Sequence, residues 1–273
     1  MSFHGAFSFS VPIELKFLVS LVLPYIEVPN IPLGPVRVYP FGILVIAGIL
    51  TGIRMILWRA SKRGLDRQIA FRLCAITALF GLAGSYLLRL LFFSRGGIYS
   101  FGGLLSGLAG GACYLRWTKL RGAAALDYID VLAFAFPFAW AFGRAGCSVA
   151  HDHPGVRTSS WLAVRFPDGP RYDLGLLELM FTLVLIALFL WLDRRPRPVG
   201  LYCGLFFALY GPFRFLLDGL HEPGVPRLLL TPDQWFGLLS TIAGVGVLWT
   251  ARIRTAPPRM HPGARTLKTP PVK

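Results

Sequence analysis

The 273-residue sequence is poor in charged side chains, and acidic side chains are much the scarcer: 13 Asp and Glu stand against 28 Lys and Arg. Charged residues make up 15% of the chain, whereas soluble domains carry about 25%. Hydrophobic residues reach 55%, and the mean hydropathy is +0.59. This balance excludes an ordinary soluble domain and indicates a membrane protein.

Cysteine is scarce as well. The four cysteines, Cys74, Cys113, Cys147 and Cys203, include no Cys-x-x-Cys pair and no zinc-ligand spacing. Three of them lie in apolar runs and are expected to be buried, inert thiols. Only Cys147 lies beside polar residues. We expect neither a metal nor an organic cofactor.

Seven runs are long and apolar enough to be read as membrane spans, since about 20 apolar residues cross the hydrocarbon core as a helix. Their approximate bounds are 41–58, 73–93, 101–115, 124–142, 174–192, 201–220 and 232–251. The third run is short and rich in glycine, so we expect it to pack closely against its neighbours or to be partly re-entrant. The fold class predicted is an all-α, polytopic membrane protein with about seven transmembrane helices.

The regions that flank these runs are rich in proline. Residues 1–40 are apolar but broken by prolines, which interrupt helices, and are interpreted as an interfacial N-terminal arm. Residues 41–251 are predicted to form a transmembrane catalytic domain. Residues 252–273 are basic and proline-rich, so a disordered cytoplasmic tail is predicted.

The net charge of +15 would favour nucleic-acid binding in a soluble protein. Here most basic residues follow the first, third, fifth and seventh runs. They are Arg59, Lys62, Arg63, Arg67, Arg72, Arg116, Lys119, Arg121, Arg194, Arg195, Arg197, Arg252 and Arg254. The positive-inside rule then places the N-terminus outside and the C-terminus in the cytoplasm. The charge is explained by orientation, and no nucleic-acid partner is expected.

Ionisable residues inside a span cost about 2.5 to 3.5 kcal/mol each, so they are functional candidates. In the sixth run, Tyr210, Arg214, Asp218 and His221 recur at helical spacing and share one face. A structural ion pair between Arg214 and Asp218 is the alternative interpretation.

A second polar cluster ends the fourth run and contains Arg144, Cys147, His151, Asp152 and His153. Arg144 and the arginine of the sixth run would lie on the same side of the membrane. Two guanidinium groups facing one cavity suit a phosphate, because their planar donors match its oxygens. Snorkelling of Arg144 to the interface is the alternative. The His-Asp-His run alone offers too few ligands to predict a metal site.

Glu178 lies early in the fifth run, on the same side as these arginines. It is either a structural counter-ion for one of them or a group that accepts a proton. Together these residues predict an intramembrane site for an anion, a phospholipid headgroup being the natural ligand. They do not name a reaction.

Taken in order, several motifs resemble those of the prolipoprotein diacylglyceryl transferase family. They are Phe41-Gly42, Gly102-Gly103-Leu104-Leu105, Gly143-Arg144-Ala145-Gly146, the stretch 174–178, Tyr210-Gly211 with Arg214-Phe215 and Asp218, Glu222-Pro223, and Gln234-Trp235. The resemblance covers roughly residues 41–247. It departs from the family at Phe101, where the family commonly has His, and at Cys147, where it has Asn. Gly-Glu is replaced by His151-Asp152, and an Arg by His221.

The resemblance implies an enzyme of the bacterial inner membrane that moves a diacylglyceryl group from phosphatidylglycerol to the lipobox cysteine of a prolipoprotein signal peptide. The product is a thioether, and glycerol phosphate leaves. The nucleophile is the substrate's thiolate, and Arg144 and Arg214 would stabilise the phosphate. His151 or His153 is expected to take the thiol proton.

Further roles follow from the same resemblance. Glu178 is placed with the catalytic residues and, with Asp218, would hold the arginines. Substrate binding is assigned to Arg144, Tyr210, Arg214, Asp218, His221, Gly102, Gly103 and Cys147. The partners expected are phosphatidylglycerol, the prolipoprotein and other membrane lipids. Two rivals remain: another phospholipid-using transferase or acyltransferase, and a lipid or anion transporter, although the two halves of the chain show no duplication.

Overall fold

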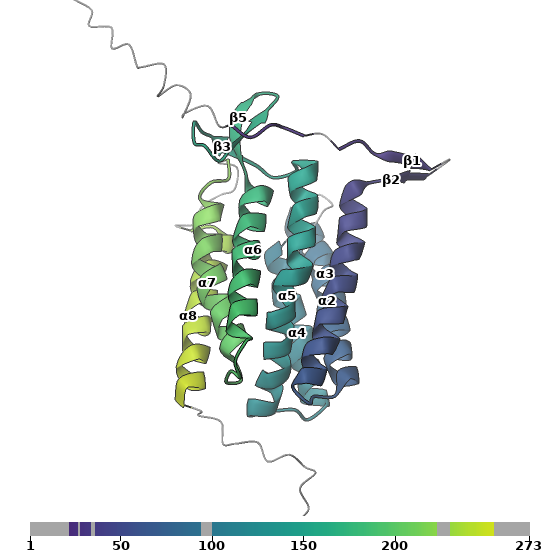
Figure 1. Cartoon of the computed structure of the whole chain (residues 1–273), viewed down its shortest axis with the longest axis vertical. Coiled ribbons are helices and arrows are strands. Elements are labelled where there is room, and N and C mark those ends of the chain that lie inside the picture. The colour runs from purple at the N-terminus through teal and green to yellow at the C-terminus, as the bar shows by residue number, and fades with distance from the viewer. Residues whose placement is uncertain (1–21, 27, 34–35, 94–99, 223–229, 254–273) are drawn as a thin grey trace, which may run out of the picture.

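The computed structural model describes residues 22–26, 28–33, 36–93, 100–222 and 230–253. Within those residues the chain forms a bundle of helices with a small sheet at one end, which we call the sheet end (Figure 1). The helices are α2 (Pro40–Lys62), α3 (Arg67–Phe93), α4 (Ser100–Trp117), α5 (Gly122–Ala150), α6 (Leu174–Leu192), α7 (Leu201–Asp218) and α8 (Pro232–Ile253). Each predicted run thus corresponds to a helix, and the bounds of 174–192 agree to the residue.

Five of these helices are long and apolar enough to cross a membrane: α2, α3 over Arg67–Leu87, α5, α6, and α8 over Pro232–Ala251. The prediction of a mostly helical, polytopic membrane protein is therefore confirmed. The other two, α4 and α7, have 18 residues each and are the shortest helices in the described part of the chain. The count of seven spans stays a prediction.

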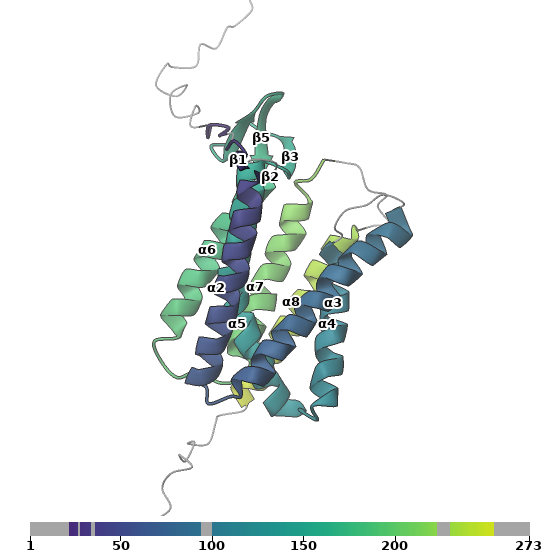
Figure 2. The ribbon, with the colours of Figure 1, turned by 90° about the vertical axis from the view of Figure 1, so that its right-hand side faces the viewer.

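Helices that follow one another in the chain pack as close pairs, α3 with α4 and α7 with α8 (Figure 2). In the first pair a Cβ at Gly103 would lie 3.1 Å from the carbonyl oxygen of Gly81. In the second pair a Cβ at Gly244 would lie 2.3 Å from the backbone nitrogen of Ala208. Glycine permits these backbones to approach, as small residues do between membrane helices. Close packing of the glycine-rich third run is thus confirmed, and α4 is one continuous helix.

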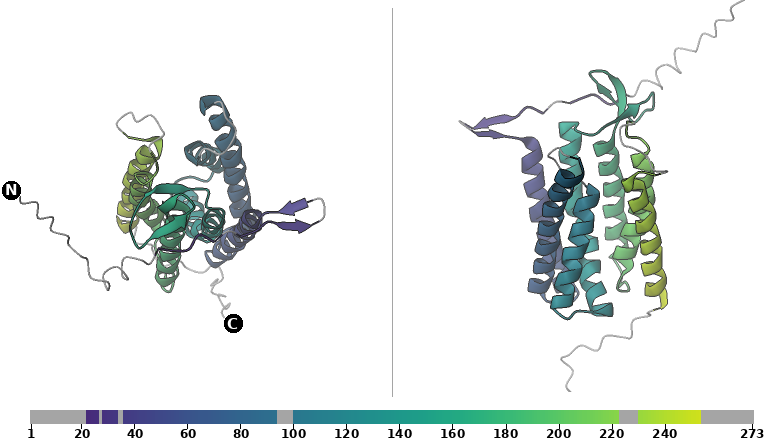
Figure 3. Two further views of the ribbon diagram at one scale, coloured as in Figure 1. Left: turned by 90° about the horizontal axis from the view of Figure 1, so that it is seen from above. Right: turned by 180° about the vertical axis from the view of Figure 1, so that it is seen from behind.

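The sheet end contains strands that the all-α prediction missed. Strands β3 (Pro154–Arg157), β5 (Gly169–Asp173) and β4 (Ala163–Phe166) pair antiparallel in that order between α5 and α6. Seen from above, this sheet covers the middle of the bundle (Figure 3). Strands of four or five residues are too short to show a clear alternation of apolar and polar positions, which is why the sequence did not reveal them.

Part of the predicted N-terminal arm is joined to this sheet. The backbone of Leu23 accepts a hydrogen bond from Arg165 and donates one to Ala163. Leu23 therefore pairs in parallel with Val164, along the edge of β4. A hairpin of β1 (Ile31–Leu33) and β2 (Val36–Val38) then leads into α2. Residues 1–21 of the arm and 254–273 of the tail lie outside the described residues.

At the opposite end a cluster of ion pairs ties four helices together. Arg59 of α2 pairs with Asp193, which ends α6, and Lys62 lies 2.7 Å from the same carboxylate. The hydroxyl of Tyr202, on α7, donates to Asp193 over 3.1 Å. The Arg59 guanidinium also lies 4.2 Å from the ring centroid of Phe134 on α5. Burial alone would raise the pKa of Asp193, but hydrogen bonds from Lys62 and Arg59 lower it.

Candidate functional site

Glu178 is the carboxylate on which the polar residues of the sheet end converge. It lies on the second turn of α6, and its side chain is 1% exposed. Its Oε1 accepts hydrogen bonds from Trp140 Nε1 at 2.8 Å and from the Tyr210 hydroxyl at 2.7 Å. Arg144 Nε lies 3.1 Å from Oε1, and Arg214 Nη1 lies 3.7 Å from Oε2. A buried carboxylate requires such partners, and here they bring the two predicted arginines to one point.

The four residues that contact Glu178 line a pocket of about 100 Å³ among α4, α5, α7 and α8. Its polar lining residues are Arg144, Tyr210, Arg214 and Asp233, and its other lining residues are Leu104, Phe136, Trp140, Phe206 and Phe236. The Arg214 Nη2 donates to Asp233 over 2.8 Å. The Arg144 guanidinium lies 4.4 Å from the ring centroid of Trp140, which suits a cation–π contact. The pocket therefore presents two positioned guanidinium groups to any anion that enters it.

Two of these contacts were missed from the sequence. Asp233 lies in the first turn of α8 and was passed over because the neighbouring Gln234-Trp235 motif does not include it and no spacing along the chain links it to Arg214. Trp140 precedes Arg144 by one helical turn, a spacing at which side chains meet. That spacing is the signal that would have revealed it.

Asp218 and His221 lie together beyond this pocket. The Asp218 carboxylate accepts from the Thr231 hydroxyl at 2.5 Å and lies 3.8 Å from His221 Nδ1. Among the described residues the carboxylate partners of Arg214 are Glu178 and Asp233, so the alternative of an Arg214–Asp218 ion pair is not formed. Asp218 therefore does not hold Arg214 in place, contrary to the expectation from the sequence. Burial, and then the nearby Arg214, lower the pKa of His221.

The two histidines predicted to accept the thiol proton lie outside the pocket lining as described. His151 Nδ1 is 2.7 Å from the Asp173 carboxylate, and its ring stacks on Tyr25 with centroids 4.0 Å apart. His153 contacts Asp152, its neighbour in the chain. A role for either as the general base stays a prediction.

Cys147 contacts Arg144 but is not among the residues that line the pocket. Its Sγ is 3.9 Å from Arg144 Nη1, and the residue is buried. Its sulfur, a carboxylate oxygen of Asp152 and a ring nitrogen of His153 all lie within 4.8 Å of one another. Thiolate, carboxylate and imidazole are all groups that can hold a metal ion.

The glycines assigned to substrate binding belong to α4. Gly103 packs against α3, Gly102 is buried, and the adjacent Leu104 lines the pocket. The side chain of Phe101 lies outside the described residues. These glycines bring the backbone of α4 close to α3.

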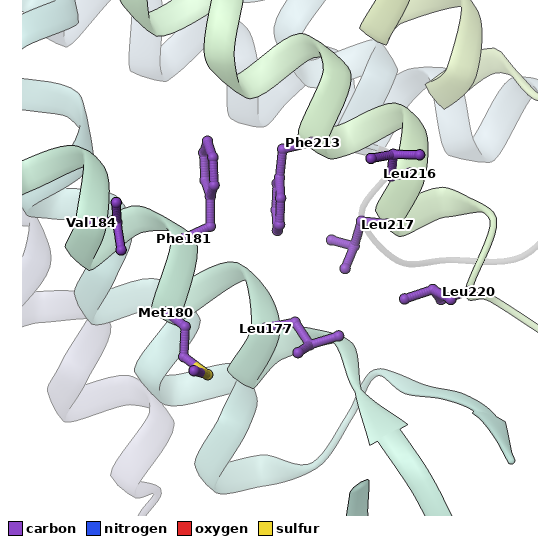
Figure 4. Close-up of a pocket in the computed structure, with 8 residues that line it drawn as sticks. All are labelled: Leu177, Met180, Phe181, Val184, Phe213, Leu216, Leu217 and Leu220. Carbon is purple, nitrogen blue, oxygen red and sulfur yellow. The ribbon is translucent and has the colours of Figure 1, made fainter. Parts of the chain in front are cut away.

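An apolar groove of about 490 Å³ separates α6 from α7 next to the polar pocket. Figure 4 shows its lining residues: Leu177, Met180, Phe181, Val184, Phe213, Leu216, Leu217 and Leu220. The rings of Phe181 and Phe213 stack with centroids 4.0 Å apart. Tyr210, which lines the polar pocket, lies 6.5 Å from Phe213 between ring centroids. A hydrophobic surface therefore adjoins the arginine pocket.

Comparison with known proteins gives one family. The family model described as prolipoprotein diacylglyceryl transferase matches residues 30–250. A phosphatidylglycerol–prolipoprotein diacylglyceryl transferase of Vibrio atlanticus is 30% identical over 229 residues, which are 73% of this chain and 81% of the relative. The enzymes with this name from Nitratidesulfovibrio vulgaris Miyazaki F and Cupriavidus metallidurans are each 28% identical, over 269 and 268 residues. The matches cover 86% and 85% of this chain, and 97% and 96% of those relatives.

Proposed function

This chain belongs to the prolipoprotein diacylglyceryl transferase family, and we propose that it transfers a diacylglyceryl group from phosphatidylglycerol to the cysteine thiol of a prolipoprotein. The observation that carries the proposal is the convergence of Arg144 and Arg214 on Glu178 beside one pocket. A phosphate is the ligand that two planar guanidinium groups bind best. The family match supplies the reaction, and the pocket supplies a place for its anionic group.

The reaction needs two things from the protein. The sulfur of the substrate cysteine must become a thiolate, and it then attacks the glycerol carbon that bears the phosphate. The S–C bond forms as the C–O bond breaks, and the electron pair leaves with the phosphate oxygen of glycerol phosphate. Arg144 and Arg214 stabilise the charge that develops there, because they are already fixed before the reaction begins.

Three side chains act on the arginines. Glu178 and Trp140 fix Arg144, while Glu178 and Asp233 fix Arg214. They are positioning residues, since each acts through a guanidinium group. Tyr210 completes the arrangement by donating to Glu178, and its ring forms part of the pocket wall.

The placement in the membrane is part of the proposal. All seven helices cross the bilayer, the sheet end faces outward, and the opposite end faces the cytoplasm of a bacterium. The turns that join α2 to α3, α4 to α5 and α6 to α7 all lie at the opposite end (Figure 1), and each carries basic residues, as the positive-inside rule requires. Residues 41–251 form the catalytic domain, and prolipoprotein signal peptides reach it from the outer leaflet.

The test uses vesicles that contain phosphatidylglycerol, the purified protein and a peptide with a lipobox cysteine. Mass spectrometry is expected to show a diacylglyceryl group on that cysteine. Arg144→Ala and Arg214→Ala should each abolish the product. Arg165→Ala is the matched control, because this exposed arginine of β4 lies outside the pocket lining.

Two outcomes would contradict the proposal. Full activity in both pocket variants would show that the arginines do not form the site. Equal activity in vesicles of phosphatidylethanolamine alone would favour a different phospholipid-using transferase.

A further inference from the structure

Three different metal-binding side chains meet where α5 ends. Cys147 Sγ, an oxygen of Asp152 and a ring nitrogen of His153 lie within 4.8 Å of one another. In a tetrahedral zinc site, bond lengths of about 2.0 to 2.3 Å place ligand atoms about 3.3 to 3.7 Å apart. A pair of donors at the 4.8 Å limit would need to approach by about 1 Å, whereas His153 Nδ1 and Asp152 Oδ1, which lie 2.5 Å apart, would need to separate by about 1 Å. His151, at φ 49°, ends the helix in the left-handed conformation and turns the chain, so that the two residues after it lie close to Cys147.

We propose that Cys147, Asp152 and His153 bind one zinc ion whose fourth ligand is the sulfur of the substrate cysteine. Thiolate, imidazole and carboxylate are the three protein ligand types that zinc accepts, and a mixed set of this kind suits zinc better than magnesium or calcium. Three protein ligands with an open fourth position are typical of catalytic zinc, whereas structural zinc has four. The spacing in the chain alone does not reveal this site, because the sulfur comes from the helix and the other donors from the turn.

The charges around the three side chains are compatible with a bound zinc ion. A zinc ion bound by one thiolate and one carboxylate has no net charge, and the substrate thiolate as fourth ligand gives the complex a single negative charge. Arg144 lies 3.9 Å from the Cys147 sulfur, and its own charge is offset by Glu178 at 3.1 Å. The side chains of Asp152 and His153 are 43% and 39% exposed, so an ion can reach them from water. Cys147 is buried and would hold the inner side of the ion.

The role of this zinc rests on the proposed function. A thiol that coordinates zinc loses its proton, here to water, and becomes the thiolate that the reaction needs. That sulfur then forms its bond to the glycerol carbon while the C–O bond breaks and glycerol phosphate leaves with the electron pair. No atom is oxidised or reduced. The thioether formed is neutral and a weaker ligand, so it leaves the zinc.

This arrangement links two features of the site. Arg144 contacts the Cys147 sulfur and also lines the phosphate pocket, so the zinc-bound thiolate and the leaving group would both lie next to one guanidinium group. A zinc-bound thiolate makes a separate protein base unnecessary.

The test begins with metal content. Full-length protein in nanodiscs is exposed to zinc, dialysed, and analysed by mass spectrometry of the metal. About one zinc per chain is expected for the unchanged protein and for Cys113→Ser, a matched control because that thiol is exposed on α4. Cys147→Ser, Asp152→Asn and His153→Gln should fall to background. The last two change exposed side chains, so unaltered melting temperatures without metal would show that the fold persists.

Cobalt provides a readout of the ligands themselves. The Co²⁺ form should show a thiolate-to-metal charge-transfer band and the visible bands of a tetrahedral site, both lost in Cys147→Ser. A peptide with a lipobox cysteine should strengthen the charge-transfer band, and the peptide with serine in its place should not. Background zinc in the unchanged protein, or a cobalt spectrum that Cys147→Ser leaves intact, would overturn the inference.

The two proposals fail in different ways. Diacylglyceryl transfer by protein that holds no zinc would overturn the metal site and leave the proposed function standing. Stoichiometric zinc with a cobalt spectrum that responds to the peptide, but without transfer from phosphatidylglycerol, would support the metal site and contradict the proposed function.

Discussion

Glu178→Gln tests the centre of the site, because the substitution keeps the shape of the side chain and removes its charge. Glutamine can still accept from Trp140 or Tyr210, but its amide group would place donors against Arg214, whose nearest nitrogen lies 3.7 Å from the carboxylate. Arg144 loses the partner it has at 3.1 Å. Removing one member of a buried ion pair costs about 3 to 5 kcal/mol. We expect a lower melting temperature and guanidinium groups that no longer point into the pocket.

The kinetic consequence separates positioning from binding. Loss of about 3 to 4 kcal/mol of transition-state stabilisation lowers kcat by about 10² to 10³. The KM for phosphatidylglycerol should change little or fall, because the pocket becomes more positive. Initial rates in vesicles of varied phosphatidylglycerol content measure both constants. Glu222→Gln is the control, since that exposed acid pairs with Arg171 on the sheet. A Glu178→Gln enzyme with unchanged kcat and melting temperature would refute this account of the site.

Three further predictions concern the surroundings of the pocket. His151→Gln should lower the free energy of unfolding by about 1 to 2 kcal/mol and leave the pH profile of transfer unchanged, whereas an altered profile would assign His151 to the chemistry. Gly244→Val should cost about 1 to 3 kcal/mol by overpacking α7 against α8; Gly246→Ala, which meets no atom within 4 Å, is the control for thermal unfolding. His221, whose pKa is lowered from its ordinary value of 6.5, should make the fold less stable as the pH falls through 6.5, because the unfolded chain takes up the proton first. Denaturant titrations at several pH values check this, and a slope that His221→Gln leaves unaltered would contradict it.

The helices were predictable because hydrophobic length is a direct requirement of the bilayer. The run 174–192 has the same bounds in the structure, since charged residues and proline end it sharply. The fourth run was predicted to end near 142, yet α5 continues to Ala150. Its last two turns carry Arg144 and Cys147. These residues interrupt the apolar run, so hydrophobicity alone did not predict the end of a helix that is stabilised by packing against α6.

The arginine pair was predictable from the cost of placing charge in a membrane, which forces each such residue to find a partner. Which partner it finds is a matter of tertiary structure. The spacing of Arg214 and Asp218 favoured a local pair, but Asp233 from the next helix takes that place. A metal site was discounted on the His151-Asp152-His153 run alone, because the approach of Cys147 to Asp152 and His153 after a left-handed turn is not visible in spacing.

The ion pairs at the end remote from the sheet are not the only contacts that hold α6 and α7 together. There Asp193 joins α2, α6 and α7, whereas at the sheet end an apolar groove separates α6 from α7. At the sheet end the contacts of Glu178 on α6 with Tyr210 and Arg214 on α7 also join these two helices. Separating the walls of the groove would therefore break a contact that holds Arg214 at the pocket.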